Sequence, residues 1–417
     1  MATGDASSHS KRILVTGLST HWGGRLAQAL EQDPSVEAII GIDRTPPKVE
    51  LVRTEFVQVS DAHSLIRRIV DAAEIDTIVD TRLVVDSIVT TPRRAHENNV
   101  IGTMNILAAC SGRDSPVRKV VVKSSAHYYG IEQDDPAFFT EDFRRKRPAR
   151  TPIERDVVEA EELVRDFALH HPDRTVTVLR FCNGIGRALR TSHSRLLALP
   201  VVLGILGFDP RYQFIHEDDI VGVLEHATRH DLPGAYNAAG DGVLVLSEVA
   251  SLLGKPFAPV LPPWGTGVAL TALRRAGLRV GPEVARQLRF GRAVDNRRLK
   301  AAGYRYRYTS RETILKLREH QRVDPLLRGT GSAYRYEREV EEFLRRSPNV
   351  RRPAPAAGAI TAPPEGFDSL DARDLIKLIP SLEPAALEAL REHEETHRAR
   401  RTVLAAIDAN LVRHQTA

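Results

Sequence analysis

The stretch "ILVTGLSTHWGGRLAQAL", residues 13–30, decides the fold of this 417-residue chain. It begins with an apolar run, continues with a glycine-containing turn, and ends in a segment whose Leu and Ala residues recur at helical spacing. The pattern predicts a buried strand, a tight turn and a helix. Gly17 and Gly23 are six residues apart, and such a turn lets backbone N–H groups at the helix N-terminus hold a phosphate. Thr20, between them, places a Cβ where backbone normally approaches the phosphate, so a strand–turn–helix unit without a ligand is the simpler alternative.

Strands and helices continue to alternate as far as about residue 240. Short runs rich in Val, Ile and Leu read as buried strands, at residues 12–17, 37–43, 55–61, 76–81, 119–125 and 175–181. The amphipathic stretches between them read as helices. Strands that are apolar throughout and joined by helices indicate a parallel sheet covered on both faces. We therefore predict an α/β fold with a doubly wound parallel-sheet domain of the Rossmann type.

Four segments make up the predicted domain organisation. Residues 11–185 form the dinucleotide-binding Rossmann-type domain, and residues 186–344 form a smaller substrate lobe, with elements near 214–240 returning to the sheet. Residues 345–366 are rich in Pro and Ala and read as a semi-rigid linker. Residues 367–413 hold three short amphipathic stretches, which predict a small helical module that packs on itself or on a protein partner.

Composition excludes several classes of protein. The chain is 42% hydrophobic and 27% charged, which is ordinary for a globular protein with a sizeable core. The longest apolar run, 196–208, is shorter than the ~20 residues that cross a bilayer, and the N-terminus lacks the apolar stretch of a signal peptide. We therefore expect a cytoplasmic protein without a transmembrane segment. Cys110 and Cys182 have no metal-ligand neighbours, which predicts no metal site and a reducing compartment.

The net charge of +5 reflects an Arg-rich stretch from about residue 270 to residue 352. Such a stretch can bind the phosphates of a nucleotide-sugar, a nucleic acid or a lipid headgroup, but a solvated basic surface is the simpler explanation. Nucleic-acid or membrane-surface binding is the least favoured of these. The stretch has few aromatic residues apart from "YRYRY" (304–308) and no groove-reading motif.

Asp43 ends the second predicted strand, about 20 residues beyond the last glycine of the turn. A carboxylate there can accept a hydrogen bond from the ribose 2′-hydroxyl of a dinucleotide and repel a 2′-phosphate, which favours NAD over NADP. Arg44 favours NADP instead, because an arginine at this position can bind the 2′-phosphate. Alternatively, Asp43 is a turn residue at the end of the strand and has no role in cofactor binding. We predict NAD as the cofactor, with NADP as the alternative.

Further signatures follow in a fixed order along the chain. Between residues 11 and 320 the sequence resembles an extended short-chain dehydrogenase/reductase of the NAD-dependent epimerase/dehydratase family. The signatures are "TGLSTHWGG" (16–24), Asp43, "SDAHSL" (60–65), "NNVIGTMNILAAC" (98–110), "VVVKSSAHYYG" (120–130), "VLRFCNGIGR" (178–187), "FIHEDDIVGVLEHA" (214–227), "GAYNAAGDGVLVLSEVA" (234–250) and "DNRRLKAAGYRYRYT" (295–309).

This resemblance implies a set of site residues. Of the candidate cofactor-binding residues, the resemblance implies Gly17, Gly23, Asp43, Asp61, Asn99 and Arg180, and the residues themselves add Thr16, Thr20, Arg44 and Arg82. The candidate substrate-binding residues are Asn183 and His216, which the resemblance implies, together with Arg211, and Ser125 takes the place of the family's catalytic Ser/Thr. The resemblance also implies a nucleotide-sugar or a similar hydroxyl compound as the small-molecule substrate. It implies a homodimer formed through the helices that include 98–110 and 152–170.

The sequence departs from the family at the catalytic pair. The family places a Tyr, which acts as general acid/base, four residues before a Lys that lowers its pKa, so that both side chains share one helix face. Aligned on Thr151-Pro152 and on Glu161, these positions hold Ile153 and Val157. Ile153 cannot exchange a proton and Val157 carries no charge. Thr151 is predicted as an N-cap and Pro152 as the first helical residue, with Glu154 closing a capping box.

Two further residues leave alternatives open. Arg82, in "DTRL" (80–83), replaces a small-residue turn that faces the cofactor, where it either binds a phosphate or partly blocks the site. His127 is a candidate catalytic base beside Ser125, with a packing role as the alternative. Tyr129 is interpreted as structural.

The sequence therefore supports two functions. One is an epimerase, dehydratase or reductase with a non-standard acid/base group. The other is a catalytically inactive NAD(P)-binding regulatory or scaffold protein, a pseudoenzyme whose C-terminal helices bind a partner.

Overall fold

The computed structural model describes residues 10–59, 63–261, 263–264, 271, 275, 281–323, 370–382, 384–397 and 399–416. Asp61 and the predicted linker 345–366 lie outside these residues. The chain divides into two compact units, residues 1–325 and residues 326–417. Each unit is described by itself.

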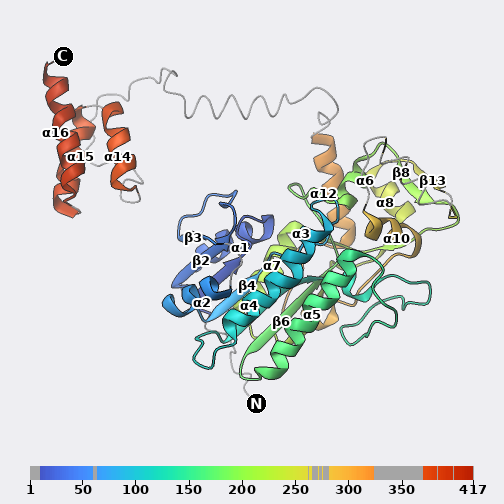
Figure 1. Ribbon diagram of the computed structural model, residues 1–417. Helices are drawn as coiled ribbons and strands as arrows, with labels where there is room; N and C mark the ends of the chain where they lie inside the picture. Colours follow the sequence, from blue (N-terminus) through green and yellow to red (C-terminus); the bar gives the residue numbers. More distant parts are fainter. Residues whose placement is uncertain are drawn as a thin grey trace. The chain divides into compact units, whose positions relative to one another are not determined.

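A seven-stranded parallel sheet forms the centre of the first unit (Figure 1). Its order is β11-β6-β5-β4-β1-β2-β3, and every neighbouring pair is parallel. The strands are β1 (Arg12–Thr16), β2 (Ala38–Asp43), β3 (Thr54–Gln58), β4 (Thr77–Asp80), β5 (Lys119–Ser125), β6 (Thr175–Phe181) and β11 (Gly234–Ala238). The winding direction reverses between β1 and β4, which creates a crevice at the carboxyl ends of these strands. The predicted doubly wound parallel sheet is confirmed.

Helices cover both faces of this sheet. On one face, α1 (His21–Glu31) and α7 (Glu217–Arg229) bury Leu26 and Leu224 against Val15 of β1. On the other face, α2 (His63–Ala72), α4 (Gly102–Cys110) and α5 (Pro152–His170) bury Ile106 and Val164 against the sheet. The short helix α3 (Pro92–His96) and one π-helical turn, η1 (Glu97–Ile101), lead into α4. Burial on both faces explains why the strand sequences are apolar throughout.

The residues after β6 build a smaller lobe around a separate core. Its elements are β7 (Asn183–Ile185), α6 (Ser192–Ala198), β8 (Val202–Ile205), β9 (Arg211–Tyr212), β10 (Phe214–His216), β12 (Leu244–Val245), α8 (Leu246–Leu253), β13 (Phe257–Leu261), α10 (Pro282–Phe290) and α12 (Ser310–Val323). The short helix α11 (Arg297–Ala301) instead packs Leu299 into the core of the main sheet, beside β11. Three two-stranded sheets, β10-β7, β12-β9 and β13-β8, connect these elements. Between them the chain returns to the main sheet as α7 and β11.

The described residues of the second unit form three α-helices, α14 (Ala372–Leu378), α15 (Pro384–His397) and α16 (Arg401–Thr416), and a 3-10 turn, η5 (Ile379–Ser381). Their apolar stripes pack on one another in a core of Leu375, Ile379, Leu387, Leu390, Val403 and Ile407. Glu394 binds the Arg400 guanidinium with two hydrogen bonds, of 2.7 and 2.8 Å. The unit therefore has an apolar core of its own. No helix within the described part of the chain is apolar and long enough to span a bilayer.

Candidate functional site

The glycine turn joins β1 to α1 at the crevice. Gly17 has φ +78°, a conformation that side chains disfavour, and a Cβ on Gly23 would lie 2.2 Å from the carbonyl oxygen of Gly17. Both positions therefore require glycine. The Thr20 hydroxyl donates to the Gly17 carbonyl at 2.7 Å and accepts from the Gly23 N–H at 3.0 Å, so it closes the turn from within. This N-cap uses one amide of the first turn of α1, at the end where the helix dipole favours an anion.

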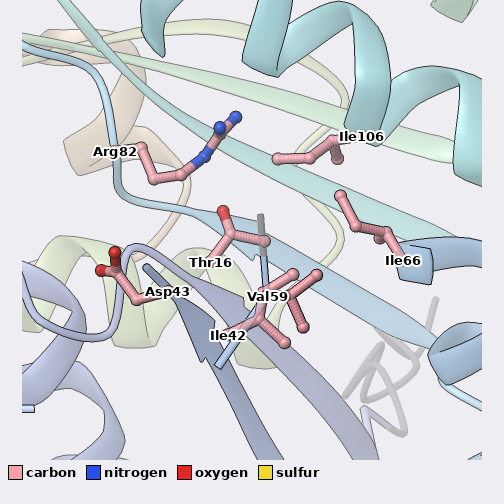
Figure 2. A pocket seen from close by; sticks show the side chains of 7 residues that line it. All are labelled: Thr16, Ile42, Asp43, Val59, Ile66, Arg82 and Ile106. Carbon is pink, nitrogen blue, oxygen red and sulfur yellow. The ribbon is translucent and has the colours of Figure 1, made fainter. Parts of the chain in front are cut away.

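Asp43 lies beside this turn, at the carboxyl end of β2. Its Oδ2 accepts from the N–H and hydroxyl of Ser19 at 2.9 and 2.6 Å, and its Oδ1 accepts from the Arg44 N–H at 2.7 Å. The carboxylate is half-buried, whereas Arg44 is exposed. Figure 2 shows the adjoining pocket, lined by Thr16, Ile42, Asp43, Val59, Ile66, Arg82 and Ile106. Its free volume is about 10 Å³, roughly the space of one water molecule.

Arg82 fills part of this pocket because it is held by Asp80. Its Nε and Nη2 atoms donate to the two carboxylate oxygens at 3.0 Å each, and the Thr16 hydroxyl donates to Oδ1 at 2.7 Å. Burial would raise the pKa of Asp80, but the charge and hydrogen bonds of Arg82 outweigh it and hold that pKa below its ordinary value. A Cβ on Gly102 would lie 2.2 Å from Arg82 Nη1. A side chain at residue 102 would therefore force the Arg82 guanidinium to shift from this position.

Ser125 and His127 form the candidate catalytic pair at the carboxyl end of β5. The Ser125 hydroxyl accepts from the His127 N–H at 3.3 Å and lies 2.7 Å from His127 Nδ1. Burial, followed by the charges of Arg292, His193 and Arg145, lowers the pKa of His127 well below its ordinary value. The imidazole is therefore neutral at pH 7, so Nδ1 can accept the Ser125 hydroxyl proton while Nε2 carries the ring hydrogen. Among the described residues Nε2 has no hydrogen-bond partner.

The helix α5 presents an apolar surface at the family's Tyr and Lys positions. Ile153 is 1% exposed and Val157 is fully buried. They form a cluster with Ala95, against which Leu83, Val85 and Tyr128 also pack. The side chains of Ile153 and Val157 themselves can neither donate nor accept a proton.

The N-terminus of α5 departs in one respect from the prediction. Thr151 is the N-cap and Pro152 begins the helix, as expected. Glu154 does not close a capping box, because its carboxylate accepts from the N–H of Arg150 at 3.0 Å instead of from the N-cap residue. Arg145 and Arg286 each bind this carboxylate at 2.7 Å and draw it away from the helix end.

Arg180 is held by internal contacts. Its guanidinium binds Glu161 at 2.7 Å and the Tyr129 hydroxyl at 2.9 Å, and lies 3.7 Å from the ring centroid of Tyr128. The Tyr129 hydroxyl donates in turn to Asn237 at 2.7 Å. A structural role accounts for Arg180 and Tyr129, and cofactor contact by Arg180 stays a prediction.

The remaining candidates also make internal contacts. Asn99 exchanges two hydrogen bonds of 2.8 Å with the backbone of Val84 and so fixes the segment after β4. Asn183 donates to the Gln213 carbonyl at 3.0 Å. His216 caps α7 through its Nδ1, which accepts from the Asp218 N–H at 3.3 Å. Arg211 is exposed on β9. Of the predicted cofactor residues, the pocket brings together Thr16, Asp43 and Arg82.

A buried polar cluster near His127 was missed from the sequence. His193 of α6 binds Gln287 of α10 through an Nε2–Oε1 contact of 3.0 Å, and its ring lies 5.8 Å from that of Tyr212. Arg292, also buried, lowers the pKa of both His127 and His193. In the described part of the chain, Gln287 Nε2, Arg292 Nη1 and the Tyr212 hydroxyl have no partner. These residues belong to separate elements, so no local motif marks them.

The sheet order, the glycine turn at the switch point and the carboxylate ending β2 together define a protein of the dinucleotide-binding Rossmann class. The sequence model of the NAD dependent epimerase/dehydratase family matches residues 13–239, and the chain belongs to this family. The resemblance seen in the sequence is thereby confirmed. No group of three or more His, Cys, Asp or Glu side chains suited to a metal ion occurs among the described residues.

Similar proteins include both uncharacterized relatives and known enzymes. An uncharacterized protein of Mycobacterium tuberculosis is 35% identical over 318 residues, which span 73% of this chain and 83% of the relative. A UDP-glucose 4-epimerase of Pisum sativum is 32% identical over 120 residues, 29% of each chain.

Solved structures share the fold. A dTDP-glucose 4,6-dehydratase of Bacillus anthracis, in complex with NAD, matches with a TM-score of 0.56 and 17% identity, over 75% of this chain and 97% of that one. A UDP-glucuronic acid 4-epimerase of Bacillus cereus, in complex with UDP-glucuronic acid and NAD, matches with a TM-score of 0.57 and 15% identity, over 75% and 99%.

Proposed function

We propose that this protein binds NAD and acts on a hydroxyl group of a nucleotide-sugar or a similar compound, with Ser125 and His127 as its acid/base pair. The observation that carries the proposal is the 2.7 Å contact between the Ser125 hydroxyl and His127 Nδ1. This contact places His127 Nδ1, a proton acceptor, next to the Ser125 hydroxyl at the carboxyl end of β5. On α5, by contrast, Ile153 and Val157 supply no such group.

The crevice supports the choice of NAD. Gly17 and Gly23 bring the N-terminus of α1 close to the end of β1, where a pyrophosphate can meet backbone N–H groups. Asp43 is half-buried beside this turn and can accept a hydrogen bond from a ribose hydroxyl. Its negative charge repels a 2′-phosphate, so NAD is favoured over NADP.

The chemistry assigned to Ser125 and His127 is proton transfer. A substrate hydroxyl next to Ser125 gives its proton to Oγ while Oγ passes its own proton to His127 Nδ1. Bound NAD would supply the hydride acceptor for the same carbon, so that the hydroxyl becomes a carbonyl. Because burial and nearby cations keep the pKa of His127 low, the imidazolium ion is short-lived and returns its proton readily. Such a pair suits a reaction that first oxidises and then reduces one carbon.

The polar cluster beside His127 supports an oxygen-rich substrate. The Gln287 amide and the Arg292 guanidinium each hold a buried N–H donor that no described residue accepts, and the Tyr212 hydroxyl is likewise without a partner. Leaving buried donors unpaired costs roughly 1–3 kcal/mol each. Hydroxyl or phosphate oxygens of a substrate would satisfy them.

A second candidate is an NAD-binding protein without turnover. The apolar contacts of Ile153 and Val157 favour it, because the helix that carries the usual acid/base pair is packed as core. The C-terminal unit, with its own core, supplies a module suited to partner binding.

Turnover on a panel of UDP- and dTDP-sugars separates the two candidates. The wild type is incubated with NAD and each sugar, enzyme-bound NADH is followed by fluorescence, and the products are resolved by chromatography. The proposal predicts turnover that S125A and H127A abolish, while both variants still bind NAD. The control is S124A, whose hydroxyl binds Glu161 instead of His127. NAD binding without conversion of any sugar would support the second candidate, and full activity in S125A would exclude the proposed pair.

A further inference from the structure

Lys123 is a buried cation in the strand that carries Ser125. The two residues are two positions apart on β5, so their side chains leave the same face of the sheet. Lys123 is only 5% exposed. Its neighbours across the sheet are Leu179 of β6 and, on the other side, the chain that continues from the end of β4. It therefore lies beneath the crevice at the carboxyl ends of the strands.

Among the described residues, one atom accepts a hydrogen bond from the Lys123 ammonium group. Nζ donates to the carbonyl oxygen of Leu83 at 3.0 Å. Leu83 belongs to the segment that follows β4, so the ammonium lies at the carboxyl ends of β4 and β5. An ammonium group has three N–H donors. The structure gives the other two no acceptor among the described residues.

The charged residues near Lys123 do not neutralise its positive charge. Asp80, at the end of β4, raises the pKa of Lys123, but this carboxylate is already bound by Arg82 and Thr16. Arg180 and Glu161 pair with each other beside Ser124, whose side chain leaves the opposite face of the sheet. Burial dominates and lowers the pKa of Lys123 to about 8. The ends of β4 and β5 thus hold two buried cations and one carboxylate, an excess of positive charge that a bound anion or oxygen-rich group would stabilise.

We propose that Lys123 is a ligand-binding residue of this site, whose Nζ holds a ribose or phosphate oxygen of the bound dinucleotide at the Ser125 end of the crevice. It supplies from β5 a positive charge for the dinucleotide, whereas Val157 of α5 carries none. This inference rests on the proposed binding of NAD. Because the ligand oxygens replace lost hydration, binding raises the pKa of the ammonium group. Near pH 8 the protein must then take up protons as it binds NAD.

The test is calorimetric titration of the full-length protein with NADH at pH 8, in two buffers that differ in ionisation enthalpy. We expect the wild type to take up as much as about half a proton per NADH, since roughly half of the Lys123 side chains are neutral at that pH. K123M, which keeps length and removes charge, should lose this uptake and bind about tenfold more weakly, the equivalent of one pKa unit. K123R, which stays charged, should lose the uptake but retain affinity within a few-fold.

The matched control is K119M. Lys119 is buried in the same strand and its pKa is also lowered by burial, but it binds Thr228, His230 and Asp231 at the opposite end of β5. K119M should bind NADH with the affinity and proton uptake of the wild type. If the wild type binds NADH without proton uptake, or K123M matches it in both readouts, the role of Lys123 is refuted while NAD binding stands. If the wild type does not bind NADH, both proposals fail. The proton uptake of the wild type is measured without any variant. The inference can therefore be refuted even if K123M does not fold.

Discussion

Arg82 and Asp80 are joined by two parallel hydrogen bonds of 3.0 Å at the point where the sheet reverses its winding. The pair leaves a pocket of only about 10 Å³ between β1, β2 and α4. Of the two interpretations that the sequence left open for Arg82, phosphate binding or partial blocking, this geometry favours the second, because the guanidinium is directed at Asp80. A ligand that enters the pocket must either displace Arg82 or bind beside it.

The first prediction concerns the stability of this pair. R82A leaves the Asp80 carboxylate buried without its counter-ion and should lower the free energy of unfolding by about 3–5 kcal/mol. The double variant D80L/R82M removes both charges and should recover most of this loss. Urea unfolding at pH 7 measures both. R93A, which breaks an exposed pair with Glu97, is the control and should change stability by less than about 1 kcal/mol. Equal losses of unfolding free energy in R82A and R93A would show that the buried pair contributes no more to stability than the exposed pair.

The second prediction concerns cofactor choice. D43N removes the charge that repels a 2′-phosphate and should weaken NADH binding by about tenfold, roughly the value of one charged hydrogen bond. It should also reduce the preference for NADH over NADPH. The measurement is the pair of dissociation constants in wild type and variant. R44A, which alters the exposed neighbour, should leave NADH binding unchanged. A wild type that binds NADPH more tightly than NADH would contradict the assignment of Asp43.

The third prediction concerns stability at low pH. Burial lowers the pKa of His193 to about 4, so between there and its unfolded value of about 6.5 the unfolded chain binds one more proton than the native protein. Stability is therefore full above that unfolded value and is lost as the pH falls, by about 1.4 kcal/mol per pH unit for one proton. H193N keeps an N–H donor for Gln287. It should reduce the slope of stability against pH by as much as the contribution of one proton, about 1.4 kcal/mol per pH unit. H170N, at an exposed histidine, should leave it unchanged. Identical slopes in H193N and wild type would count against a buried neutral His193.

The fourth prediction concerns the family's lost catalytic pair. Restoring it with I153Y and V157K should add little to the turnover of the wild type, because the acid/base group of this protein is assigned to Ser125 and His127. V157K also buries an ammonium group in an apolar cluster, which should destabilise the fold by several kcal/mol. Thermal unfolding and sugar turnover of the single and double variants measure both effects. A large gain of turnover in the double variant would identify this surface as a dormant site and contradict the assignment.

Much of the fold could be predicted because its signals are local. Gly17, Gly23 and Asp43 stand at fixed distances along the chain, and the apolar strand runs report burial on both faces of the sheet. The sequence identified Arg82 as a candidate site residue but did not identify Asp80 as its partner. Their pairing depends on a turn after β4 and on the absence of a side chain at Gly102. His193, Gln287 and Arg292 come together only through the packing of the lobe. Lys123 gave no signal, since a lysine in a strand is ordinarily read as an exposed or edge position.

The most direct test of the account is whether the crevice binds NAD. Trp22 lies in the first turn of α1, and Trp264, the only other tryptophan, is exposed. Titration of the W264F variant with NADH, followed by Trp22 fluorescence and checked by calorimetry, reports on the glycine turn itself. We predict saturable quenching with a dissociation constant on the order of micromolar, and weaker binding of NADPH. Absence of binding up to millimolar NADH would contradict both the enzyme and the NAD-binding protein without turnover, and would leave the fold as a scaffold.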